Sequence, residues 1–208
     1  MTVRDRLYQT LEIPWVYRLV QEVAAPGAGW LLTRVAREAF GDSRGPVLDV
    51  GCGPELSTPR PVAGLLCGVD ISLRYTWSYG SHPDPRQVAV RASAERLPFG
   101  DGAFAECRCW GLLHHLPPAV ASGAVAELVR CARPGGRVVI GDAVWPRRAW
   151  TRPVAWLGRR LDRGEWVREE HELLELIQAA APGAWRHRRF TYTVHGLEGL
   201  LLTLEVPR

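Results

Sequence analysis

Glycines and acidic residues at the ends of two apolar runs are the first residues whose types and spacing suggest chemistry. The run VLDV carries Asp49 and is followed by Gly51 and Gly53, and a second run, LLCGVDI, carries Asp70 about 20 residues further on. Glycines at the carboxyl end of a buried strand let the chain turn tightly and let a ligand approach main-chain N–H groups. A carboxylate at the second position can accept both hydroxyls of a ribose. Together they indicate a cofactor that contains a nucleoside.

The residues after the glycines narrow the choice of cofactor. A dinucleotide site has a third glycine at a helix N-terminus that receives a pyrophosphate. Here Gly53 is followed by Pro54 and Glu55, and the next glycine is Gly64. The negative charge of Glu55 would repel a pyrophosphate, whereas Asp49 suits the cationic amino-acid group of a methionine moiety.

Two adjacent histidines are candidates for proton transfer. His114 and His115 follow the apolar run Ala103 to Trp110, at the end of the sheet where open α/β folds bind ligands. Histidine suits general base catalysis near neutral pH. The alternative is that a histidine here caps a turn or orders the loop through hydrogen bonds. His195, in a later predicted hairpin, is a weaker candidate.

Short apolar runs and helical periodicity alternate along the chain, which favours an α/β fold. We expect seven strands, at Val47 to Val50, Leu65 to Ile71, Gln87 to Val90, Ala103 to Trp110, Arg137 to Asp142, Trp185 to Val194 and Leu200 to Val206. Helices are expected within residues 1–41, at Ala119 to Ala132 and at Glu169 to Ala180. The last two strands lack an intervening helix and read as an antiparallel hairpin.

These motifs in this order resemble the class I S-adenosylmethionine-dependent methyltransferases. The segments that carry the resemblance are VLDVGCGP, GVDIS, ASAERLPFGDGAF, LLHHLPPAV and LVRCARPGGRVVIGDAV, and they cover roughly residues 45–143. Within the class, the chain is most similar to the quinone-biosynthesis C-methyltransferases and their small-molecule relatives. The resemblance implies a Rossmann-like, doubly wound, seven-stranded sheet, mostly parallel, with a C-terminal antiparallel hairpin and N-terminal helices.

The resemblance also implies a role for each motif residue. Asp49, Gly51 and Gly53 would surround the methionine part of S-adenosylmethionine, and Asp70 would hold the ribose hydroxyls with Ile71 against the adenine. The remaining positions are Ser93, Ala94 and Glu95 at the adenine edge and Trp110, whose backbone would face the methionine carbons. No metal is required for methyl transfer, because it is an in-line displacement at a sulfonium.

Several positions depart from the family pattern. Ser93 stands where the family usually has Asp or Asn, and Ala105 stands where it favours Asp. Prolines at 54, 59 and 61 should leave the helix after the glycine turn short or distorted. Glu106 and Arg108 share one face of a central strand, where a buried pair needs good geometry to offset desolvation.

The segment Trp145 to Arg168 is rich in arginine and tryptophan. Trp150, Val154, Leu157 and Leu161 fall on one helical face, with Arg147, Arg148, Arg159, Arg160 and Arg163 around it. One hypothesis is a lid whose arginine pairs with an anionic acceptor, and another is a membrane-surface helix that fetches a lipid or quinone. The third is a packed helix with solvated arginines. Tyr8 and Tyr17, further upstream, are expected in packing or in closing the pocket.

Composition limits the remaining possibilities. The 208 residues suit one domain, divided into an N-terminal helical cap (1–41), a cofactor-binding core (45–143), an Arg/Trp-rich lid (144–168) and a C-terminal helix and hairpin (169–208). All 26 basic residues are arginine and the net charge is only +4, which does not favour nucleic acid. Five cysteines without metal-ligand spacing indicate buried thiols in a reducing compartment.

The sequence therefore predicts a cytoplasmic methyltransferase, monomer or homodimer, that transfers a methyl group from S-adenosylmethionine to an O, N or C atom of a small metabolite. Two alternatives stay open at this point. The first is a membrane-associated enzyme acting on a lipid or quinone, with peripheral contact through residues 147–163. The second is a cofactor-binding protein of the same fold without transfer activity.

Overall fold

A seven-stranded sheet forms the centre of the computed structural model, which describes residues 28–40, 45–53, 64–147, 150, 152–160 and 164–208. The strand order is β3-β2-β1-β4-β5-β7-β6. Strand β1 pairs in parallel with both β2 and β4, and β7 alone runs antiparallel to its neighbours β5 and β6. The predicted mostly parallel sheet with a closing hairpin is confirmed, and the second hairpin strand inserts between β5 and β6.

Most element bounds lie within a few residues of those expected from the sequence, but helix α4 was not among the expected elements. The strands are β1 Val47–Val50, β2 Leu66–Asp70, β3 Gln87–Arg91, β4 Phe104–Trp110, β5 Ala132–Val144, β6 Arg186–Thr191 and β7 Glu198–Glu205. The helices are α3 Ala28–Ala39, α4 Leu73–Gly80, η1 Leu113–His115, α5 Pro118–Cys131, α6 Pro153–Arg160 and α7 Glu170–Ala180. Strand β5 starts five residues before the predicted Arg137, because Ala132 already pairs with Phe104 of β4.

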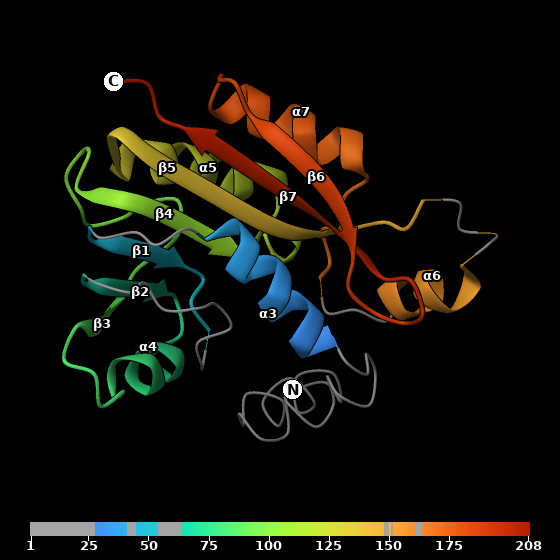
Figure 1. Ribbon diagram of the computed structural model, residues 1–208, viewed down its shortest axis with the longest axis horizontal. Coiled ribbons are helices and arrows are strands. Elements are labelled where there is room, and N and C mark those ends of the chain that lie inside the picture. The colour runs from blue at the N-terminus through green and yellow to red at the C-terminus, as the bar shows by residue number, and fades with distance from the viewer. Residues whose placement is uncertain (1–27, 41–44, 54–63, 148–149, 151, 161–163) are drawn as a thin grey trace.

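Helices cover both faces of the sheet, as Figure 1 shows with α3 in front of the strands and α5 behind them. The larger apolar cluster joins alternate residues of β1 and β4, including Leu48 and Cys107, to α5 and α7. On the other face, α3 packs Val35 and Phe40 against Val139, while α4 places Tyr79 beside Val47. The sheet is thus doubly wound. The expected distortion of the helix after β1 concerns residues 54–63, outside the described ranges.

The buried pair on β4 is held by partners from three elements. Glu106 Oε1 accepts a hydrogen bond from Arg108 Nε, and its Oε2 accepts from Arg137 Nη2 of β5 at 2.7 Å. The Arg108 guanidinium lies 4.1 Å from the ring centroid of Phe40, and its side chain is 1% exposed. Asp49 of β1 is the residue in register with Arg108. The Glu106 carboxylate is paired with two arginines, and the Arg108 guanidinium also lies against an aromatic ring. Each buried charge therefore has the close partners that burial requires.

All five cysteines are buried, as expected for small hydrophobic side chains. Burial raises the pKa of the Cys67 thiol to about 11 and raises the pKa of Cys109 well above its usual value. These thiols are therefore protonated near neutral pH. Within the part of the chain described, no helix has the length and the apolar character needed to cross a membrane.

The buried pair gives a stability prediction. Glu106→Val should cost about 3 to 5 kcal/mol of unfolding free energy, because Arg108 would stay buried without its carboxylate. The double variant Glu106→Val/Arg108→Met should recover most of the loss, since the charge that needs a partner is gone. Urea denaturation measures both. A Glu106→Val protein as stable as the parent would contradict the pairing.

Candidate functional site

Backbone hydrogen bonds fasten the glycine turn after β1 to the end of β2. The N–H groups of Gly51 and Cys52 donate to the Val69 carbonyl at 2.8 and 3.1 Å. The Gly53 N–H donates to Asp70 Oδ2 at 3.2 Å, and Ser72 N–H donates to Asp70 Oδ1 at 2.8 Å. The fold thus brings together the glycine turn and the acidic residue that the sequence singled out separately.

Both glycines in the turn require a left-handed backbone. Gly51 has φ +75° and Gly53 has φ +65°, a region that other residues rarely adopt. A Cβ on Gly51 would lie 2.9 Å from Leu112 in the loop after β4. A Cβ on Gly53 would meet no described atom within 4 Å, so open space adjoins this part of the turn. The accessible backbone at Gly53 lies beside the half-buried carboxylate of Asp70. This combination fits a ligand that contains a nucleoside and a flexible tail.

Asp70 is electrostatically tuned by its surroundings. Burial raises the pKa of its carboxyl above the ordinary value, while the N–H groups of Ser72 and Gly53 act in the opposite direction. Three backbone N–H groups, those of Ser72, Gly53 and Ile71, donate to the carboxylate, and its two oxygens have about four acceptor positions, so capacity for a further donor is left. That arrangement suits recognition of two adjacent hydroxyls.

Asp49 is more deeply enclosed than the sequence implied. Its side chain is 3% exposed and its Oδ2 accepts a hydrogen bond from the Tyr79 hydroxyl of α4 at 3.2 Å. Tyr79 fits there because Gly68 of β2 has no side chain, and a Cβ at Gly68 would lie 2.6 Å from the tyrosine ring. Burial raises the Tyr79 pKa, so the hydroxyl stays a donor. The sequence analysis missed Tyr79, although a glycine inside a strand pattern signals close approach.

The residues expected around the adenine lie beside Asp70. The N–H of Ala92, which precedes Ser93, donates to the Asp70 carbonyl at 3.2 Å, so the turn Ser93, Ala94, Glu95 follows directly. Ile71 is 70% exposed at the end of β2. An exposed aliphatic side chain next to the ribose-binding candidate is consistent with packing against a base. Their roles toward adenine remain predictions.

Trp110 directs its side chain away from the glycine turn. The indole stacks with Phe190 of β6 at 6.2 Å between centroids and meets the Phe40 ring edge-on at 5.6 Å. It covers Gly141 of β5, where a Cβ would overlap the ring. The bulky indole therefore packs against Phe40, which follows α3, and against β6. Trp110 is the last residue of β4, so its backbone lies at the carboxyl edge of the sheet, and its role toward the methionine carbons stays a prediction.

His114 forms a buried dyad with Asp142 of β5. Its backbone N–H donates to Asp142 Oδ2 at 3.0 Å, and its Nδ1 pairs with Asp142 Oδ1. Gly111 lies beside the ring, since a Cβ there would be 3.9 Å from His114 Cε1. A carboxylate on Nδ1 directs any proton transfer to Nε2, as in other carboxylate–histidine pairs. The sequence analysis did not name Asp142 as a site residue, although its position at the end of a predicted strand made it a candidate.

The end of the Arg/Trp-rich segment closes over His114. Trp166 N–H donates to the His114 carbonyl at 3.0 Å, and Arg168 donates to the carbonyls of Leu113 and Leu116 at 2.8 Å each. Burial lowers the Arg168 pKa, with Asp142 opposing the shift. Gly164 packs against the imidazole, because a Cβ there would overlap the ring.

The other proton-transfer candidates lie elsewhere. His115 is exposed, with its ring 4.0 Å from that of His114, and His195 is exposed in the turn between β6 and β7. Of the adjacent pair, His114 is the buried one and pairs with the Asp142 carboxylate. Tyr8 and Tyr17 lie outside the described residues.

The hypothesis of a packed α6 with solvated arginines is wrong for Arg159 and for the apolar face of the helix, whereas Arg147 and Arg160 are exposed. Arg159 is 2% exposed, whereas Val154 and Leu157 are 58% and 54% exposed. The guanidinium is buried because its Nη2 donates to the Tyr192 hydroxyl and to the Glu198 carbonyl. The helix thus turns its apolar side outward. Leu161, Arg148 and Arg163 lie outside the described residues.

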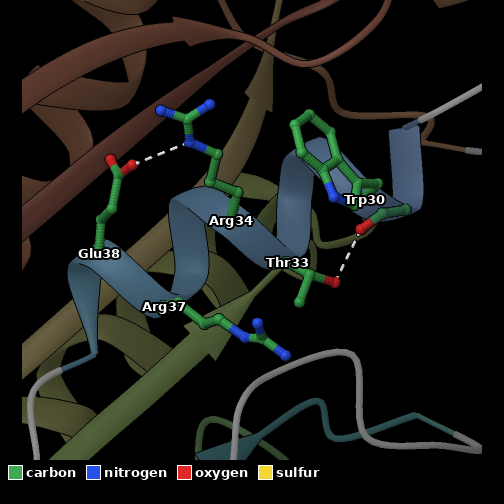
Figure 2. A pocket seen from close by; sticks show the side chains of 6 residues that line it. Trp30, Thr33, Arg34, Arg37 and Glu38 are labelled. Carbon is green, nitrogen blue, oxygen red and sulfur yellow. Dashed lines mark hydrogen bonds and ion pairs between the residues drawn. The ribbon is translucent and has the colours of Figure 1, made fainter.

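A hollow of about 500 Å³ lies along the outer side of α3 (Figure 2). Trp30, Thr33, Arg34, Arg37 and Glu38 line it, and Arg34 pairs with Glu38 at 3.3 Å. These residues face away from the apolar side of α3 that contacts the sheet. Nothing in the described residues links this hollow to the glycine turn.

Comparison with known proteins agrees with this geometry. Residues 48–140 match the methyltransferase domain family. A demethylmenaquinone methyltransferase of Beutenbergia cavernae is 32% identical over 135 residues, covering 62% of this chain and 54% of that protein. A 27-O-demethylrifamycin SV methyltransferase of Amycolatopsis mediterranei is 30% identical over 104 residues, covering 46% and 38% of the two chains. The crystal structure of YcgJ from Bacillus subtilis aligns with a TM-score of 0.66 at 18% identity, covering 86% and 99%.

The glycine turn, Asp70 and His114 all fall within residues 48–140, the part of the chain that matches the methyltransferase domain family. The chain spans about half the length of the Beutenbergia cavernae relative. The structural alignment, at 18% identity, supports the fold alone.

A substitution at Gly164 tests whether the segment from Gly164 to Arg168 packs closely over His114. Gly164→Ala should cost about 1 to 3 kcal/mol in stability, because its Cβ would overlap the His114 ring and lie 2.9 Å from the His114 carbonyl oxygen. Gly158→Ala in α6 is the matched control, since its nearest contact would be an ordinary 3.9 Å. Thermal melting compares the two. Equal melting temperatures would argue against close packing of residue 164 on the histidine.

Proposed function

We propose that this protein binds S-adenosylmethionine and transfers its methyl group to a small-molecule acceptor. The observation that carries the proposal is the contact between Gly53 N–H and Asp70, which joins the glycine turn to the ribose-binding candidate. Around it, open space adjoins the backbone of Gly53, and Ile71 with the Ser93 to Glu95 turn borders the adenine side. Asp49, held by Tyr79, supplies negative charge behind the turn.

The bound cofactor would supply an electrophilic methyl group on a sulfonium. The task left to the chain is to hold the acceptor in line and, where the acceptor carries a proton, to remove it. His114 is the proposed base, oriented by Asp142 on Nδ1. The residues closing over it, from Gly164 to Arg168, would limit the access of water to the imidazole.

The acceptor is proposed to be a small metabolite, and two relatives bear on its chemistry. Their names refer to a demethylated menaquinone and to the 27-O position of a rifamycin, so they favour a bulky acceptor with an apolar part. A lipid or prenylated quinone is the second candidate, favoured by the apolar residues that α6 exposes. Five buried thiols fit the predicted cytoplasmic location, and the proposed assembly is a monomer or homodimer.

Calorimetry with the purified protein tests cofactor binding. S-adenosylmethionine and S-adenosylhomocysteine should bind in the micromolar range, and Asp70→Ala should abolish binding because the ribose hydroxyls lose their acceptor. NAD is the control ligand. Because the Asp70 pKa is raised, affinity should start to fall at a higher pH than for an exposed carboxylate as the solution is acidified. Absence of binding to either nucleoside would refute the proposal, and binding without transfer to any screened acceptor would favour the cofactor-binding alternative.

Kinetics with an acceptor found by screening test the dyad. His114→Gln should lower kcat by about 10²- to 10⁴-fold while the affinity for S-adenosylhomocysteine stays unchanged, because the imidazole acts only in proton removal. Asp142→Asn should lower kcat as well, and His115→Gln is the control. A His114→Gln enzyme with the parent rate would assign this histidine to loop structure.

A further inference from the structure

Helix α6 holds an arginine inside and its apolar residues outside. The two buried side chains are Ala155 and Arg159, one helical turn apart. Outward lie Val154 and Leu157, and just before the helix Trp150 is 82% exposed. An amphipathic surface helix normally buries its apolar stripe. The orientation of α6 therefore needs a cause other than apolar burial.

Polar contacts with the β6–β7 hairpin provide that cause. Arg159 Nη2 donates to the Tyr192 hydroxyl at 2.7 Å and to the Glu198 carbonyl at 2.8 Å. Arg152, which directly precedes the helix, donates to Glu198 Oε1 at 2.5 Å. Two arginines thus fix both ends of α6 to the start of β7. A rotation of α6 that buried its apolar residues would break the hydrogen bonds of Arg152 and Arg159 with the hairpin. The apolar residues therefore stay exposed.

A second element adds to the exposed apolar surface. The turn between β6 and β7 packs on the start of α6, since a Cβ on Gly196 would lie 3.0 Å from Arg152. Within this turn, Val194 is 80% exposed. Figure 1 shows the turn beside α6, at the end of the molecule beyond β5. We call Trp150, Val154, Leu157 and Val194 the α6 patch.

The charge around the α6 patch is positive. The nearby carboxylates of Glu170 and Glu198 already accept from Arg147, Arg152 and Arg189. Arg160, in the last turn of α6, lies with its guanidinium 5.1 Å from the Trp156 ring centroid. Among the described residues from 147 to 160, Arg147 and Arg160 are exposed and none is acidic. An apolar patch with a cationic rim complements an anionic lipid surface.

We propose that the α6 patch docks this protein on an anionic lipid bilayer, with Trp150, Leu157 and Val194 entering the interface and Arg160 meeting lipid phosphates. This partner goes beyond methyl transfer and is independent of it. Tryptophan and arginine are the side chains suited to the boundary between acyl chains and headgroups. A protein partner fits less well, because a stable interface buries about 800 Å² on each side, more than one eight-residue helix and a turn can offer. Docking would turn the carboxyl edge of the sheet, where α6 follows β5, toward the bilayer.

Vesicle co-sedimentation of the full chain tests the proposal. The protein should bind vesicles of phosphatidylcholine with phosphatidylglycerol, bind pure phosphatidylcholine weakly, and dissociate at high salt. Trp150→Ser/Leu157→Ser should weaken binding by about tenfold or more, since two exposed apolar side chains no longer enter the interface. The matched control is Leu73→Ser/Trp77→Ser on α4, which alters side chains 64% and 73% exposed near the opposite edge of the sheet.

Each other outcome overturns the proposal. No binding to anionic vesicles, or equal losses in the two double variants, would remove the α6 patch as a lipid surface. A chain that is dimeric in light scattering and becomes monomeric in Trp150→Ser/Leu157→Ser would assign the patch to a second copy of the chain. Cofactor titration without vesicles keeps this test separate from the proposed enzymatic function.

Discussion

The position of β1 between β2 and β4, parallel to both, is the constraint on which the rest of the site depends. Parallel pairing places the carboxyl ends of three strands at one edge, so the glycine turn meets Asp70 on one side and the loop after β4 on the other. It also sets Asp49 in register with Gly68 and Arg108. A shift of one residue would reverse every side chain between the two helical layers. Both the proposed cofactor site and the buried charges thus follow from a single strand register.

The charges inside the sheet form one connected arrangement on the α3 and α4 face. Arg108 contacts Glu106 along its own strand and lies under Phe40, and Asp49 in the next strand receives the Tyr79 hydroxyl. Two carboxylates with buried arginine and tyrosine donors avoid an uncompensated charge in a low dielectric. Such an arrangement defines the position of Asp49 more firmly than apolar packing would. It therefore links the stability of the sheet to the geometry behind the glycine turn.

The fold was largely predictable from the sequence, because strand and helix periods are local signals. The glycine turn and Asp70 were predictable for the same reason, as each is marked by residue type at a strand end. Contacts between distant segments were not. Tyr79 meets Asp49 across 30 residues and Asp142 meets His114 across 28, and neither pairing leaves a local pattern. The orientation of α6 was also inaccessible, because Arg159 is buried by Glu198 and Tyr192, which lie more than 30 residues away.

Because polar groups anchor α6, its outward-facing residues can be substituted during evolution more freely than core residues. The helix contributes one alanine and the guanidinium of Arg159 to the interior, so its outward residues carry little of the folding energy. Substitutions at those positions can alter what this end of the molecule recognises without loss of stability. A surface separated in this way from the core can change its partner through single mutations, while the seven-stranded sheet and its buried charges keep their packing.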